Sequence, residues 1–181
     1  MGRTSAKVLK SRLVYSGPVF RVHKDDVIEP GGVRAVRDVV AHFGSIVLLP
    51  VLRDGRILLV RQYRHPVRES LWELVAGRIE LGESPLAAAR RELLEETGYT
   101  ARRYRKLLEF VPAPGYTSEV MLLYLAKELT AGAAQPEEDE RLTLRAFSLR
   151  ELEARIRRGA LRDGKTIAGI LYYARFARRR R

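Results

Sequence analysis

The chain has 181 residues and carries 34 Lys and Arg side chains against 22 Asp and Glu, a formal net charge of +12. Its length and apolar fraction of 46% suffice for a domain with a buried core and exclude a largely disordered chain. Cysteine is absent, which excludes disulfides, thiolate metal sites and a cysteine nucleophile.

No stretch approaches the roughly 18 consecutive apolar residues of a membrane-spanning helix, so we expect no membrane partner. No signal-peptide pattern is found at the start, and we expect a cytoplasmic protein. The positive charge favours anionic partners such as phosphorylated small molecules. The terminal run Arg178–Arg181 contains no interleaved aromatic residue, so it does not predict a specific nucleic-acid partner.

The N-terminal part of the chain is predicted to be extended. Val19–Val22 and Val33–Val40 are rich in valine, and the Pro-Gly-Gly sequence at residues 30–32 predicts a turn between them. We expect residues 1–43 to form an antiparallel β extension and residues 44–181 to form the main domain.

A hairpin is the clearest local prediction. Ser45–Leu52 and Arg56–Gln62 are apolar, β-branched-rich runs that flank Asp54-Gly55, a pair typical of a type I′ turn. A strand fragment is predicted at Leu71–Val75.

A helix is predicted to begin at Ser84-Pro85, because serine caps free helical amides and proline is favoured at the first helical position. Leu86–Thr97 are mostly good helix formers, and Gly98 is suited to end the helix in a left-handed conformation.

The remaining elements follow in chain order. Strands are predicted at Leu107–Val111, Val120–Leu129 and Leu142–Phe147, a loop at 130–140, and helices at Arg150–Arg158 and Thr166–Phe176. Strands outnumber helices and the predicted hairpin is antiparallel. This pattern favours an α+β fold, a mixed sheet with helices packed on it, over a doubly wound parallel sheet.

Carboxylates gather on one face of the first predicted helix. Glu92, Glu95 and Glu96 fall within a wedge of roughly 100°, and Glu83 lies just before the helix. Like charges at i, i+4 cost a few tenths of a kcal/mol per pair, roughly, and anions near a helix C-terminus are disfavoured. A bound Mg²⁺ or Mn²⁺ resolves the conflict, since both prefer oxygen ligands. The alternative is a solvated acidic helix end with Arg90 and Arg91 as partners.

The whole segment resembles the signature of the Nudix hydrolases. Gly77 is followed by five residues, Glu83, seven residues and then Arg-Glu-Leu-Leu-Glu-Glu-Thr-Gly-Tyr at residues 91–99. Every fixed position of the signature matches, with an aromatic Tyr99 where an aliphatic residue is commoner. The resemblance implies a Nudix-type α/β/α sandwich with a mixed β-sheet from about Ser45 to the end of the chain.

Residues outside this segment resemble the ADP-ribose pyrophosphatase subfamily. Pro114 lies sixteen residues after Gly98, and the stretches Val60–Pro66 and Leu74–Glu80 are similar to that group. Sugar-nucleotide pyrophosphatases share several of these markers. In related dimers N-terminal strands reach the partner subunit, so the resemblance implies that residues 1–43 mediate a homodimer.

The resemblance also implies roles for the acidic residues. Glu92 and Glu96 are carried over as the main Mg²⁺ ligands, with the Ala76 carbonyl as a backbone ligand and Glu95 and Glu83 as secondary ligands. Arg91 is expected to pair with one of these glutamates. In this subfamily an acid of the late loop often takes the proton of the attacking water, and a glutamate of the signature sometimes does. Glu140 is our first candidate and Glu138 the second.

Substrate contacts are expected from residues outside the signature. Arg64 is the first candidate for a substrate arginine and Arg37 the second, because a guanidinium group suits phosphate. Glu80 is a candidate for the adenine or ribose, Val19 and Phe20 for the base, and Gly115 to Ser118 for the terminal ribose. For Val19 and Phe20 a purely structural role stays open.

The resemblance therefore implies Mg²⁺-dependent hydrolysis of ADP-ribose to AMP and ribose 5-phosphate. One alternative is a pyrophosphatase that prefers a GDP-sugar or another nucleoside diphosphate derivative. The other is a non-catalytic Nudix-fold module that binds a nucleotide or RNA, although binding alone does not require the crowded acidic face.

Overall fold

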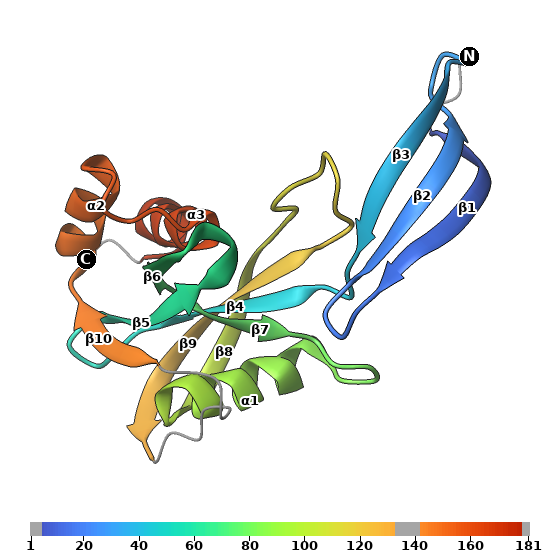
Figure 1. Cartoon of the computed structure of the whole chain (residues 1–181). Helices are drawn as coiled ribbons and strands as arrows, with labels where there is room; N and C mark the ends of the chain where they lie inside the picture. Colours follow the sequence, from blue (N-terminus) through green and yellow to red (C-terminus); the bar gives the residue numbers. More distant parts are fainter. Residues whose placement is uncertain (1–4, 133–141, 179–181) are drawn as a thin grey trace. The chain divides into compact units, whose positions relative to one another are not determined.

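The computed structural model describes residues 5–132 and 142–178 and divides the chain into two compact units. One unit comprises Met1–Gly44 together with Val111–Val120, and the other comprises Ser45–Phe110 together with Met121–Arg181. Each unit has its own sheet structure, and Figure 1 gives the labels of the helices and strands.

The first unit is built on a three-stranded antiparallel sheet. Its strands β1 (Lys7–Ser16), β2 (Arg21–Ile28) and β3 (Arg34–Ala41) pair in chain order. The turn predicted between the last two is confirmed, with Gly31 and Gly32 at φ values of 95° and 90° that favour glycine.

This sheet has almost no core of its own. Val27 is the one buried side chain of its three strands, all of which the structure describes, and every residue of β1 is exposed. The exposed apolar residues include Leu13 and Val14, about half accessible. A sheet with two exposed faces buries too little apolar area to be stable by itself.

The second unit contains two sheets. A mixed sheet has the order β7 (Val75–Arg78), β4 (Ser45–Pro50), β9 (Met121–Ala131) and β8 (Tyr99–Phe110). In it β4 runs parallel to β9 and antiparallel to β7. A smaller antiparallel sheet has the order β10 (Thr143–Phe147), β5 (Ile57–Arg64) and β6 (Glu69–Glu73).

Strand β4 lies at the centre because it is apolar on both faces, and all six of its residues are buried. Ile46 and Leu48 belong to the core cluster that includes Leu93 of the first helix. Val47 and Leu49 point the other way, into the cluster that includes residues of the C-terminal helices. Burial of each such side chain contributes about 1.5–3 kcal/mol.

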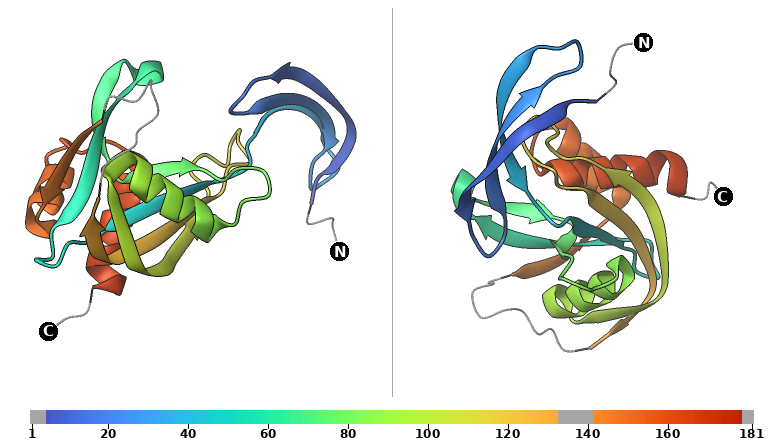
Figure 2. Two further views of the ribbon diagram at one scale, coloured as in Figure 1. Left: turned by 90° about the horizontal axis from the view of Figure 1, so that it is seen from below. Right: turned by 90° about the vertical axis from the view of Figure 1, so that its right-hand side faces the viewer.

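Helices cover both faces of the mixed sheet (Figures 1 and 2). They are α1 (Pro85–Thr97) on one face, and α2 (Leu149–Arg157) and α3 (Gly164–Tyr172) on the other, with α3 continuing into a π-helical turn at Tyr173–Ala177. The predicted α+β class and mixed sheet are confirmed. No helix of the described residues is long and apolar enough to cross a lipid bilayer.

The predicted hairpin at Asp54-Gly55 is partly wrong. Leu52 and Arg56 close a three-residue connection in which Gly55 has a φ of 84°, while Asp54 is not among the residues with positive φ, so the turn is not type I′. Beyond the Val51–Ile57 bridge the two strands separate, because β4 pairs with β7 and β9 whereas β5 pairs with β6 and β10.

One strand is longer than predicted, and another was not predicted as a separate strand. The strand expected at Leu107–Val111 begins at Tyr99, directly after α1, and β1 was not separately predicted. Residues 102–106 carry four basic side chains and lack apolar alternation, so their strand conformation follows from pairing with β9 along the length of β8.

Candidate functional site

Helix α1 has the ends that its sequence predicts. The Ser84 hydroxyl accepts a hydrogen bond from the Ala87 amide at 3.2 Å, and Pro85 occupies the first turn. Gly98 ends the helix at a φ of 69°, and its amide donates to the Leu94 carbonyl at 2.8 Å. These two ends fix which side chains face the sheet.

The buried face of α1 carries Ala88, Ala89 and Leu93, which are fully buried against the mixed sheet. Small side chains at two of these positions allow the helix to lie close to strands β4 and β7. The glutamates of this helix, Glu92, Glu95 and Glu96, therefore lie on its side next to β7 and the loop that follows β7. This side is called the acidic edge of α1.

Arg91 holds this acidic edge together. Its Nε and Nη2 donate to the two Glu83 carboxylate oxygens at 3.1 and 3.0 Å. Its Nη1 donates to Glu92 at 2.7 Å and to Glu95 at 3.1 Å, and Nη2 also donates to the Arg78 carbonyl at 3.0 Å. One guanidinium thus joins three carboxylates and the end of strand β7.

The charges of this cluster stabilise one another. The hydrogen bonds to Glu83, followed by those to Glu92 and Glu95, raise the pKa of Arg91 above its ordinary value although partial burial acts against this. The hydrogen bond from Arg91 and that from the Glu80 amide lower the pKa of Glu83 in turn. Arg91 and Glu83 therefore each favour the charged form of the other.

Gly77 leaves room for the Glu92 carboxylate. A Cβ atom at position 77 would overlap the carboxylate carbon and both oxygens of Glu92, far inside van der Waals contact. The glycine of strand β7 and the glutamate of α1 are therefore matched in space, which explains why this position requires glycine.

Ala76 precedes this glycine in β7, and Glu96 is on α1, where it is 6% exposed. Among the described residues no three Asp, Glu or His side chains form a metal-ligating group, and Arg91 lies among the glutamates. The donor set nevertheless fits a hard cation, because the glutamates of α1 offer carboxylate oxygens and no soft ligand.

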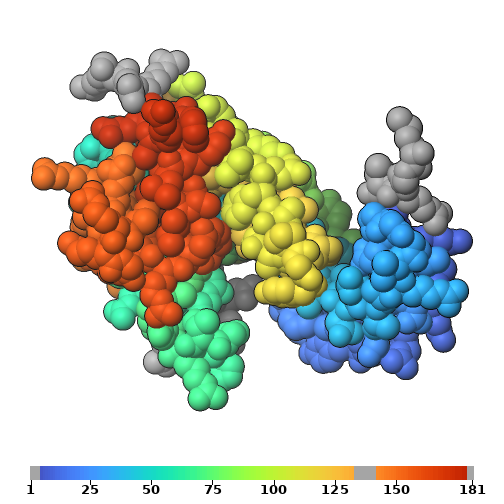
Figure 3. Space-filling model, turned by 90° about the horizontal axis from the view of Figure 1, so that it is seen from above, coloured from blue at the N-terminus to red at the C-terminus, as the bar shows by residue number. Residues whose placement is uncertain are grey.

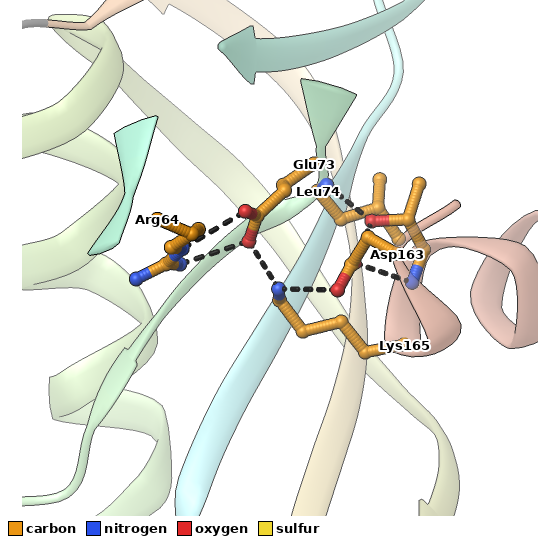
Figure 4. A network of polar contacts seen from close by, with 6 residues as sticks. Arg64, Glu73, Leu74, Asp163 and Lys165 are labelled. Carbon is orange, nitrogen blue, oxygen red and sulfur yellow. Dashed lines mark hydrogen bonds and ion pairs between the residues drawn. The ribbon is translucent and has the colours of Figure 1, made fainter. Parts of the chain in front are cut away.

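A second polar network lies at the junction of β6 and β7 (Figure 4). Glu73 is 1% exposed, and its two carboxylate oxygens accept hydrogen bonds from Arg64 Nε at 2.9 Å and Nη2 at 2.8 Å. Lys165 Nζ donates to the same carboxylate and to Asp163 at 3.0 Å. Two carboxylates are thus balanced by two cations.

Burial alone would raise the pKa of Glu73, but the hydrogen bonds from Arg64 and the charge of Lys165 outweigh it and hold the pKa below its ordinary value. The hydrogen bonds to Glu73 raise the pKa of Arg64, and the negative charges of Glu96 and Asp163 contribute in the same direction. Arg64 is therefore within electrostatic reach of the acidic edge of α1.

The sequence did not single out Glu73, Asp163, Lys165 or Thr166. Two signals were present: a glutamate within the otherwise apolar run Leu71–Val75, and an Asp-Gly-Lys-Thr sequence suited to begin a helix. Neither signal shows that the two segments meet, since they are separated by 92 residues.

The other predicted site residues are dispersed. Glu80 is exposed, and its amide donates to Glu83 at 3.1 Å. Glu138 and Glu140 lie outside the described residues. The remaining candidates belong to the other compact unit: Val19, Phe20, Arg37, Gly115 and Ser118.

Within that unit Arg37 pairs with Glu29 at 2.8 Å, and the Ser118 hydroxyl accepts a hydrogen bond from the His42 amide at 3.1 Å. Val19 and Phe20 are 42% and 38% exposed, so neither is a core residue of this unit.

A cavity of about 680 Å³ lies elsewhere in the second unit, along β8, β9 and the C-terminal turn. Its lining includes Arg103, Arg105, Lys127 and Arg178 and contains none of the glutamates described above. The chemistry of the acidic edge, and not this cavity, therefore defines the candidate site.

Comparison with known proteins points to one family. The NUDIX domain model matches residues 42–169. A methanol dehydrogenase activator of Bacillus methanolicus is 36% identical over 92% of this chain and 91% of its own length. An ADP-ribose pyrophosphatase of Bacillus subtilis is 34% identical over 92% of this chain and 91% of its own length.

A solved structure of an ADP compounds hydrolase superposes with a TM-score of 0.82, covers 94% of this chain and 93% of its own, and is 23% identical. At that identity the likeness shows a shared fold. The differing names of the two sequence relatives mean that identity alone does not select a substrate.

Proposed function

The chain belongs to the Nudix hydrolase family, and from this we propose that it hydrolyses the pyrophosphate bond of ADP-ribose, giving AMP and ribose 5-phosphate. The family assignment rests on the match over residues 42–169 and on relatives above 30% identity over most of their length. The observation that carries the proposal is the acidic edge of α1, where Gly77 makes room for Glu92 and Arg91 joins three glutamates.

In the proposed reaction a water oxygen attacks one phosphorus of the pyrophosphate. A new P–O bond forms, the bond to the bridging oxygen breaks, and the leaving phosphate takes the bridging oxygen with its electron pair. The water proton passes to a carboxylate. For that acceptor we propose Glu140, with Glu138 as the second candidate.

We propose Glu92, Glu96 and the Ala76 carbonyl as the groups that hold Mg²⁺, with Glu95 and Glu83 in support. When bound, the cation supplies positive charge that neutralises the phosphate oxygens and lowers the pKa of water. The role of Arg91 is positional: by holding Glu83, Glu92 and Glu95 it keeps like charges on one edge before a cation arrives.

Substrate phosphates carry negative charge toward this acidic edge, so a cationic side chain is needed beside it. Arg64 meets this requirement, since it lies within electrostatic reach of Glu96. We propose that Arg64 contacts the pyrophosphate and that Glu80, in the loop after β7, contacts the adenosine part. Further substrate contacts are proposed for Arg37, Val19, Phe20, Gly115 and Ser118.

A substrate panel tests the proposal. The purified protein is incubated with ADP-ribose, GDP-mannose and a diadenosine polyphosphate, each with Mg²⁺, and the products are identified by chromatography. We expect AMP and ribose 5-phosphate from ADP-ribose at the highest kcat/KM. A higher kcat/KM for GDP-mannose would identify a GDP-sugar as the substrate in place of ADP-ribose. If the folded protein hydrolyses none of the compounds, a binding module is favoured.

We further propose that residues 1–43 mediate a homodimer in the cytoplasm. The three-stranded sheet of this segment buries only Val27 among its strand residues and exposes Leu13 and Val14, so it gains stability when a second copy covers a face. Light scattering at micromolar concentration should give twice the 20.6 kDa chain mass. A monomer would refute this proposal.

A further inference from the structure

The N-terminus of α3 is attached to the strand that leads into the acidic site. Asp163 caps the helix by accepting hydrogen bonds from the Thr166 amide at 3.0 Å and from its hydroxyl. Thr166 is fully buried, and its hydroxyl oxygen accepts a hydrogen bond from the Leu74 amide at 2.7 Å. Leu74 lies between β6 and β7, where the chain passes from one sheet to the other, so it has no strand partner for this amide.

Lys165, the residue next to this cap, completes the attachment. Its ammonium group contacts Glu73 and Asp163, and its side chain is 10% exposed. Figure 3 shows the C-terminal segment, orange to red, lying against the green β5–β6 hairpin, and Arg162 pairs with Glu69 of that hairpin at 2.6 Å. The start of α3 is thus joined to β6 through two separate ion pairs.

Glu73 passes this constraint to Arg64. The Glu73 carboxylate accepts hydrogen bonds from Nε and Nη2 of Arg64, and these two bonds fix the plane of the guanidinium. The remaining guanidinium nitrogen points away from Glu73 in Figure 4. The Arg64 side chain is 40% exposed, whereas the Glu73 side chain is 2% exposed. A guanidinium held on one edge can present the other edge to a phosphate oxygen.

The charge balance explains why a lysine is needed. Without Lys165, the buried Glu73 and the partly buried Asp163 would be balanced by Arg64 alone, and the Arg64 charge would be drawn toward these two carboxylates. With Lys165 in place, Glu73 has a second cation, and the positive charge of Arg64 is available to a substrate next to Glu96.

We propose that Lys165 is a positioning residue that acts through Glu73 on Arg64, so that Arg64 presents one guanidinium edge to the pyrophosphate of a nucleoside diphosphate substrate. This inference rests on the proposed function. It assigns to Lys165 a role in substrate binding although this residue belongs to helix α3.

A double-mutant cycle tests the coupling. Lys165→Met removes the charge and keeps the aliphatic stem, and Arg64→Met removes the proposed phosphate contact. We expect Lys165→Met to raise the KM for ADP-ribose about tenfold with kcat within about threefold, since the contact is made in both ground and transition states. In the Arg64→Met background Lys165→Met should change KM less than about twofold.

Lys165→Arg should bring KM back close to the wild-type value, because it again places a positive charge beside Glu73. Lys127→Met is the matched control, an exposed lysine of β9 in the same unit, and should leave KM unchanged. Thermal unfolding of each variant checks the fold. If Lys165→Met does not fold, Lys165→Gln, which keeps a hydrogen-bond donor without the charge, takes its place in the cycle.

Independent, multiplicative effects of the two substitutions on KM would overturn the inference, as would a wild-type KM in Lys165→Met. The cycle is measured on the panel compound that the wild-type protein hydrolyses best. A wild-type protein that hydrolyses none of them overturns the proposed function and this inference together, whereas an active wild type with multiplicative effects overturns the inference alone.

Discussion

Replacing Gly77 with alanine separates activity from stability at this site. The new methyl group would overlap the Glu92 carboxylate, so the carboxylate must withdraw by roughly 1 Å or more to regain van der Waals separation. That movement also breaks the 2.7 Å hydrogen bond from Arg91 to Glu92. A misplacement of this size in a catalytic arrangement costs about 100-fold in rate, or about 2.7 kcal/mol of transition-state stabilisation.

The cost to folding should be small. The displaced group is the far end of a flexible side chain, and alanine is favoured over glycine in a strand by roughly 0.5–1 kcal/mol, which offsets the lost contact. We therefore expect the free energy of unfolding of Gly77→Ala to stay within about 1 kcal/mol of wild type. Gly164→Ala is the matched control, because a Cβ atom there meets open space.

Two measurements are needed for Gly77→Ala. Release of AMP from ADP-ribose with saturating Mg²⁺ gives kcat, and urea denaturation followed by circular dichroism gives the free energy of unfolding. A wild-type kcat would refute the match between Gly77 and Glu92. An unfolded Gly77→Ala would show that the glycine is needed for the strand and not for the carboxylate.

Three further predictions follow from the same contacts. Glu92→Gln should lower kcat by orders of magnitude with unchanged thermal unfolding, and near wild-type turnover would remove Glu92 from the site. Thr166→Val leaves the buried Leu74 amide without its acceptor and should lower the free energy of unfolding by about 1–3 kcal/mol in urea; an unchanged value would contradict that contact. The pKa of Glu73 lies below its ordinary value of 4.5, so the stability that its ionised form contributes is present above pH 4.5 and lost as the pH falls through the lower folded value. The gap in unfolding free energy between wild type and Glu73→Gln should therefore narrow below pH 4.5, and a gap that widens on acidification would contradict the direction of the shift.

Local signals sufficed for the carboxylate helix. The Ser84 and Gly98 caps act within a few residues of the helix ends, so the sequence contains both partners of each capping contact. The spacing of Glu92, Glu95 and Glu96 follows from helix geometry alone, and the resemblance implied that the Ala76 carbonyl joins Glu92 and Glu96 as a ligand. For that reason this part of the site was predictable.

Strand partners were not predictable in the same way. The apolar runs of β4 and β5 read as a hairpin because a turn lies between them, yet a strand buried on both faces has no alternation that selects a partner. The partners of β4 come from β7 and β9, far along the chain. Pairing of this kind is decided by the whole core and not by the turn.

The network around Glu73 was missed for the same physical reason. Lys165 and Thr166 meet Glu73 and Leu74 across 92 residues, and no local pattern indicates such a meeting. A buried glutamate requires a cationic partner, but the sequence contains 34 lysines and arginines from which to choose. The fold selects Arg64 and Lys165 among them.

Crystals grown with Mn²⁺ and ADP-ribose in the Glu140→Gln background give the most direct test of the account, because manganese is located by its anomalous scattering. We predict an anomalous peak bound by Glu92 and Glu96, with the pyrophosphate against it and Arg64 in contact with a phosphate oxygen. Manganese and nucleotide bound together at another place, with these two glutamates contacting neither, would contradict it.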